Sequence, residues 1–206
     1  MLYGKSLKYI FHLIFHPFDG FWDLKFEKRG SLGAALTIVI LTIITLSVEK
    51  QGTGFLYNMN RLSELNIVVD IFTIVLVYVL WCTANWCTTS LMEGKGRMID
   101  ILIAVGYSMA PIVLIRLPLV AVSHVITSGE GSFYVVFKTI SVIWALFLLF
   151  LGTMITHQYS VKKTIATCII TVVGMGIIMF IGLLFFNVIG RMITFVATIY
   201  KELRFR

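Results

Sequence analysis

The sequence predicts an all-α fold, a polytopic membrane helix bundle, and three observations lead to that prediction. Apolar residues make up 59% of the chain and charged residues only 13%. The mean hydropathy is +0.96, a value typical of membrane proteins rather than soluble domains. Several apolar runs are long enough to cross a hydrocarbon core of roughly 30 Å, which takes about 20 helical residues. These runs lack the alternating pattern of a membrane barrel, so helices must satisfy the backbone in lipid.

Five apolar runs meet this length requirement and are the predicted transmembrane helices. No cleavable signal is expected before the first of them, because the apolar run 10–15 is short and is interrupted by His12. The transmembrane domain therefore covers residues 31–190, between an N-terminal segment 1–30 and a basic tail 191–206. The predicted spans are residues 31–48, 67–92, 99–126, 133–155 and 164–189.

The N-terminal segment is predicted to be an interfacial helical foot. On a helix, Lys5 and Lys8 share one side with two histidines, while apolar residues such as Phe11 fill the opposite side. This is the pattern of a helix that lies on a membrane surface. Pro17 then begins a second helix, whose Trp22 and three phenylalanines are typical of the headgroup zone. We expect membrane-surface contact through Lys5, Lys8, Phe11 and Trp22, with packing against the bundle as the alternative.

The distribution of basic residues predicts the orientation. With five crossings and the N-terminus inside, the inner segments hold nine Lys and Arg residues and the outer segments six. The positive-inside rule therefore predicts a multi-pass plasma-membrane protein with a cytoplasmic N-terminus. The basic tail would then lie outside, and we expect it to form an interfacial helix. The net charge of +7 fits attraction to an anionic lipid leaflet rather than to nucleic acid.

The polar turn at residues 93–97 is too short for anything but a hairpin, so the second and third spans are expected to lie side by side. In the second span, Asn85 is expected to bond to a neighbouring helix. In the third, Gly106 and Ala110 have the spacing of small residues that lets another backbone come close. The residues predicted to pack helices together or to interact are Asn85, Gly106, Tyr107, Ser108, Ala110 and Pro111.

Two charges in the third span are the candidate functional charges, Asp100 and Arg116. Asp100 begins the span at the inner surface. Arg116 lies 18 residues after Met98, about 27 Å of helix, which places its guanidinium near the outer headgroups. This predicts that the span ends at Arg116, that the side chain snorkels, and that residues 117–126 lie along the outer interface. Lys138, on the same side, receives the same interpretation. The alternative is a buried Arg116 on an ion pathway.

Elements of three catalytic or binding motifs occur in this sequence, but each motif lacks a part that it needs. The Gly106–Ala110 stretch imitates a nucleophile elbow, but that motif needs a strand, a turn and a helix. The histidines do not form a metalloprotease motif, and the 93–97 turn lacks the length and the following Ser or Thr of a phosphate-binding loop. We therefore expect no enzyme activity, no catalytic residue, no cofactor and no metal.

Two stretches resemble a known family. These are the segment HPFDGFWDLKFEKRGS at residues 16–31 and the sequence Gly-Tyr-Ser-Met-Ala-Pro at residues 106–111. With five spans and a very short second connection, they resemble the Ypt-interacting protein (Yip) domain family, and its bacterial branch in particular, over roughly residues 16–190. The eukaryotic members' Asp-Leu-Tyr-Gly-Pro signature is absent, so Rab GTPase binding and vesicle traffic are not carried over. The resemblance implies a non-enzymatic membrane protein that associates with others, as an accessory component beside transport systems.

Two functional hypotheses follow. The first is a membrane-embedded adaptor or accessory subunit whose partners are the lipid bilayer and other integral membrane proteins, transporter subunits or further copies of the chain. The second is a small permease or channel subunit with a polar path near Asn85 and Arg116, because broken helices often line membrane sites.

Overall fold

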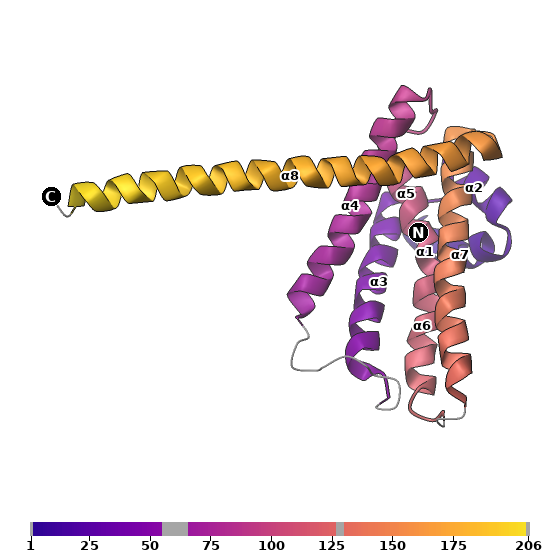
Figure 1. The fold of residues 1–206 in the computed structure, drawn as a ribbon. Helices are drawn as coiled ribbons and strands as arrows, with labels where there is room; N and C mark the ends of the chain where they lie inside the picture. Colours follow the sequence, from indigo (N-terminus) through magenta and orange to yellow (C-terminus); the bar gives the residue numbers. More distant parts are fainter. Residues whose placement is uncertain (1, 55–65, 127–129, 205–206) are drawn as a thin grey trace.

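The computed structural model describes residues 2–54, 66–126 and 130–204, and this part of the chain is helical without a strand. Five helical segments are long and apolar enough to cross a membrane. The predicted all-α fold class and the five candidate spans are therefore confirmed. The helices are α1 (Leu2–Phe15), α2 (Pro17–Phe26), α3 (Leu32–Gly52), α4 (Ile67–Leu91), α5 (Met98–Ser108), α6 (Ala110–Val122), α7 (Gly131–His157) and α8 (Val161–Arg204) (Figure 1).

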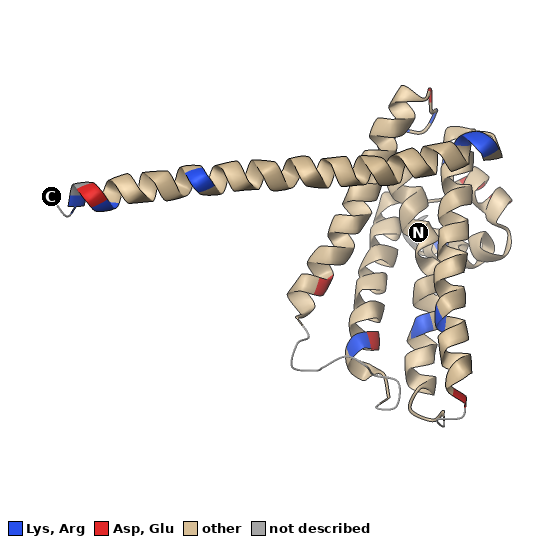
Figure 2. Cartoon of the chain, in the orientation of Figure 1, with Lys and Arg blue, Asp and Glu red and all other residues tan. Residues whose placement is uncertain are grey.

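The arrangement is a bundle with one helix lying across its end. Helices α3, α4, α5–α6 and α7 run alongside one another, whereas α8 crosses the bundle and extends well beyond it (Figure 1). We call the end that holds the 92–97 turn and the 158–160 connection the turn end. Figure 2 shows that long stretches of each span carry no charge and that charged positions of α3, α6 and α7 gather in the half farther from α8.

Local capping explains where two of the spans begin. The side chain of Ser31 accepts a hydrogen bond from the Ala34 N–H at 3.2 Å and starts α3. The Asn66 side chain accepts from Val68 and Val69 at 3.0 and 3.3 Å and starts α4. Both residues satisfy N–H groups that the first turn of a helix leaves without an intrahelical partner.

The third span continues past Arg116. The α5 and α6 helices form one candidate span from Met98 to Val122, so the prediction that it ends at Arg116 is wrong. The α6 helix passes Arg116 without a break, and Leu119 and Val120 beyond it are buried. Pro111 is in the first turn of α6, where its missing N–H costs no hydrogen bond.

The N-terminal foot shares the core of the bundle. Leu13 of α1 and Phe21 of α2 are fully or almost fully buried, in one cluster with Ala35 and Tyr107. The alternative of packing against the bundle is therefore correct for this face. Lys5, Lys8, Phe11 and Trp22 are exposed, so their contact with a membrane surface stays a prediction.

The α8 helix does not end where predicted. It continues as one helix of 44 residues to Arg204, about 66 Å long and roughly twice the thickness of a hydrocarbon core. The expected separate tail is thus a continuation of α8, and Arg206 lies outside the described residues. Only the start of the helix packs closely. Thr164, Thr167 and Thr171 are fully buried, while no described side chain between Val172 and Arg204 is buried.

Gly106 sets the distance between α3 and α5. A Cβ atom added there would lie 2.9 Å from the Ala35 Cβ and 3.0 Å from the Ala35 carbonyl oxygen. Because the nearest atoms include backbone, a larger residue forces the two helices apart. This is the close approach that small residues permit in membrane helix pairs.

We therefore predict that Gly106→Leu destabilises the bundle by about 1–3 kcal/mol or more, the cost of overpacking a well-packed interior. Thermal unfolding in mild detergent, followed by tryptophan fluorescence, measures the effect. Gly176→Leu is the matched control, since no neighbouring atom lies within 4 Å of a Cβ at that position. Equal melting temperatures for the two variants would contradict the proposed contact.

Candidate functional site

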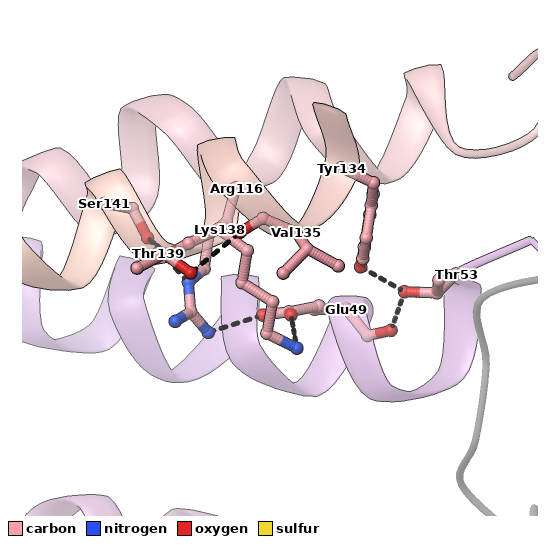
Figure 3. A network of polar contacts seen from close by, with 8 residues as sticks. All are labelled: Glu49, Thr53, Arg116, Tyr134, Val135, Lys138, Thr139 and Ser141. Atoms are coloured by element: carbon pink, nitrogen blue, oxygen red, sulfur yellow. Dashed lines mark hydrogen bonds and ion pairs between the residues drawn. The ribbon is translucent and has the colours of Figure 1, made fainter. Parts of the chain in front are cut away.

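The most polar constellation in the described residues lies between α3, α4, α6 and α7, and we call it the charge cluster: Glu49, Lys50, Asp70, Arg116 and Lys138. Glu49 is at its centre (Figure 3). Its Oε2 accepts a hydrogen bond from an Arg116 Nη at 2.8 Å, and its Oε1 lies 2.7 Å from the Lys138 Nζ. Arg116 Nε also donates to the Ser141 hydroxyl at 3.0 Å. One carboxylate thus holds cations from two other helices.

The Arg116 side chain is largely covered by the bundle rather than snorkelling. It is 12% exposed, and that of Glu49 is 8% exposed. The snorkelling expectation is wrong, because a carboxylate on α3 supplies the counter-charge within the bundle. Glu49 was missed because the predicted first span ends at Val48, whereas α3 continues one turn further. An arginine deep in a span, with a carboxylate at the end of another span, was the signal available.

A cavity of about 240 Å³ adjoins the charge cluster. Lys50 and Asp70 form a second ion pair across it, with 2.6 Å between Nζ and Oδ1, and join α3 to α4. The Tyr134 hydroxyl lies 3.4 Å from that of Thr53 on another wall. Four helices therefore contribute polar groups to one hollow.

Asn85 belongs to a different part of the molecule. It is buried, and its Nδ2 donates to the Thr171 hydroxyl of α8 at 3.4 Å. The cavity beside it holds only about 10 Å³ and shares no lining residue with the cavity at Arg116. The structure does not bring Asn85 and Arg116 together. The geometry of Asn85 is that of an interhelical hydrogen bond.

Asp100 caps the N-terminus of α5. Its Oδ2 accepts from the Arg97 N–H at 3.0 Å and lies 3.5 Å from the Arg97 Nε. A carboxylate in the first turn satisfies a free N–H group and interacts favourably with the helix dipole. These contacts account for Asp100 as a capping residue.

The remaining predicted packing residues are buried in the third span. The Tyr107 hydroxyl donates to the Ser6 carbonyl at 3.0 Å and so ties α5 to α1. The Ser108 hydroxyl donates to the Ala104 carbonyl at 2.7 Å, within its own helix. Ala110 and Pro111 are also buried. These contacts fit packing rather than catalysis.

A contact that the sequence did not suggest holds the foot to the turn end. The Lys25 Nζ donates to the Thr156 carbonyl of α7 and, at 3.4 Å, to the Lys95 carbonyl of the hairpin turn. Burial lowers the pKa of Lys25 from its ordinary value, and the neighbouring cations Lys95 and Arg97 act in the same direction. Lys25 thus joins three segments that are distant in sequence.

We predict that Glu49→Leu costs about 3–5 kcal/mol of unfolding free energy, because it leaves buried Arg116 without a counter-charge. Glu49→Leu combined with Arg116→Met should recover most of that loss, since Lys138 is half-exposed and can turn to water. Unfolding in a detergent–SDS titration measures four free energies, those of the unmodified chain, Glu49→Leu, Arg116→Met and the double variant. Strictly additive losses in the double variant would show that the two side chains are not coupled.

One family of known proteins matches most of the chain. The model of the Yip1 domain matches residues 11–200, a range that begins in α1 and ends in α8. It includes the foot from residue 11 onward, the bundle and most of α8. No curated protein and no solved structure matches the chain significantly. The resemblance noted from residues 16–31 and 106–111 is confirmed, and the chain, a multi-pass helical membrane protein, belongs to the Yip1 domain family.

Proposed function

We propose that the protein is a non-enzymatic adaptor or accessory subunit, embedded in the plasma membrane with its N-terminus in the cytoplasm, that binds another integral membrane protein such as a transporter subunit. The observation that supports this most is the part of α8 after Thr171, residues 172–204, which we call the α8 extension. Its described side chains are exposed or half-exposed although the helix is strongly apolar.

The α8 extension has more apolar surface than its own bundle uses. Gly174 still lies against Ala84 and Thr88 of α4, but bulky residues further along, such as Phe185 and Phe186, are exposed. Lipid alone could cover them. However, a helix of about 66 Å is longer than a single crossing needs, and it leaves the bundle sideways (Figure 1). A helix in this position is suited to contact a second membrane protein beside the bundle.

The interior favours an adaptor over an enzyme. The described residues contain no group of three or more His, Cys, Asp or Glu side chains that could hold a metal. Ser108, the centre of the elbow-like sequence, donates its hydroxyl to a carbonyl of its own helix. A nucleophile needs a base within hydrogen-bond reach instead.

The permease hypothesis has weaker support. It requires a polar path between the region of Asn85 and that of Arg116, and the two cavities share no lining residue. Arg116 is also bound to Glu49 and Ser141, as expected for a structural ion pair. A fixed pair of this kind gives ions no route by itself.

The adaptor proposal predicts where a photo-crosslinker captures protein. Benzoylphenylalanine in place of Phe186 on the α8 extension should give a discrete protein adduct in native membranes. The same group in place of Ile143, an exposed residue on α7, is the control and should capture mainly lipid. Mass spectrometry identifies the adducts. Lipid adducts alone at position 186 would contradict the proposal, and an adduct of exactly two copies of this chain would replace it by self-association.

A second prediction separates partner binding from folding. Gly182 has no atom within 4 Å of an added Cβ, so Gly182→Leu should leave the melting temperature unchanged. A partner helix packed there would be displaced at a cost of about 1–3 kcal/mol, or about 5-fold to 150-fold in affinity. Gly4→Leu, at an equally open glycine of the foot, is the control. Unchanged crosslinking yield in Gly182→Leu would exclude that face of α8 from the interface.

A further inference from the structure

The cavity beside the charge cluster is large enough to hold a ligand. Its volume is about 240 Å³, whereas a single water needs only about 10–15 Å³ of such space. Its walls come from α3, α4, α6 and α7 and include Glu49, Lys50, Asp70, Arg116, Tyr134 and Lys138. This is a polar hollow within a bundle whose other surfaces are mostly apolar.

The charges around the cavity are unequal in number and in exposure. Among the described residues that line it, three are cations and two are carboxylates. The side chains of Glu49, Arg116 and Asp70 are 8%, 12% and 19% exposed, while those of Lys50 and Lys138 are 43% and 46% exposed. A group that enters the cavity therefore meets positive charge first. This arrangement favours an anion over a cation.

Donor groups are available to that anion. Among the described residues, Arg116 donates through Nε to Ser141 and through one Nη to Glu49, which leaves other N–H groups of its guanidinium. Lys138 contacts Glu49 through one ion pair and has further N–H donors. A planar guanidinium fork next to a mobile ammonium is a combination that binds phosphate oxygens well.

The depth of the cavity fits a phosphate group at the membrane boundary. Glu49 lies one turn before the end of α3 at Gly52, and Asp70 one turn after the start of α4 at Ile67. One helical turn is about 5.4 Å. The cavity is thus close to the headgroup level, where both a lipid phosphate and a dissolved anion can reach it.

We propose that the cavity bounded by Arg116, Lys138 and Lys50 is a binding site for a phosphate-type oxyanion, supplied by an anionic lipid headgroup or by a free phosphate. Glu49, the covered carboxylate, holds Arg116 and Lys138 in position. The bound oxyanion neutralises the positive charge that Glu49 does not. This site is independent of the α8 extension and of the adaptor role. It adds a ligand to the end of the bundle opposite the turn end.

The experiment uses the full chain in a maltoside detergent. One arm titrates inorganic phosphate against chloride at constant ionic strength and follows the melting temperature by tryptophan fluorescence. The other arm adds phosphatidylglycerol or phosphatidylcholine and counts bound lipids by native mass spectrometry. We expect phosphate to raise the melting temperature, phosphatidylglycerol to be retained over phosphatidylcholine, or both. Stabilisation by phosphate without lipid retention assigns a free anion, and lipid retention assigns a headgroup.

Three variants test the residues. Lys138→Gln should weaken binding by about tenfold, in line with the loss of one charge-assisted hydrogen bond. Lys138→Arg should keep it within about threefold, since the charge is retained. Lys162→Gln, an exposed lysine at the turn end, should have no effect. The proposal is overturned if neither probe binds the unmodified chain, or if Lys162→Gln weakens binding as much as Lys138→Gln.

Discussion

In lipid, a polar group inside a span has no water to bond with, and its partner must come from the protein. This constraint accounts for polar connections between the described helices, of which three are examples. Glu49 of α3 binds Arg116 of α6 and Lys138 of α7. Asn85 of α4 binds Thr171 of α8. Tyr107 of α5 binds the backbone of α1. Apolar packing brings these helices together, but the polar pairs decide which faces meet.

The same constraint explains what the sequence could predict and what it could not. Span positions follow from length and apolar composition, so four of the five predicted helices agree with the structure to within a few residues at most ends. Asn85 could be interpreted correctly because a buried amide needs only one neighbouring helix. Arg116 could not, because its position depends on Glu49, a residue 67 positions away in the chain. The length of one helix predicts only how far Arg116 lies from the headgroups. It does not show that a carboxylate of another span is close enough to serve as the counter-charge.

The foot and α8 show a second limit of sequence reasoning. An amphipathic pattern shows that a helix has two faces, but not which solvent or surface covers each. Leu13 and Phe21 turn out to be core residues, while Phe11 and Trp22 are exposed. The last apolar run likewise has the composition of a span, but its direction depends on the turn at Gln158 and Tyr159 and on the threonine face that meets α4. The turn lies outside the run, and the threonines within it do not show which helix they meet.

The adaptor proposal depends on the direction of α8, because an adaptor surface exists only if the α8 extension lies away from its own bundle. Spin labels at Phe133 of α7 and Phe185 of α8, both exposed, test this directly in lipid nanodiscs by electron double resonance. Each position is about 36 Å of helix from the turn between α7 and α8. The structure predicts a separation of several helix diameters within one chain. A separation of about 10 Å, the spacing of packed neighbouring helices, would mean that α8 folds back along α7 and would contradict the account.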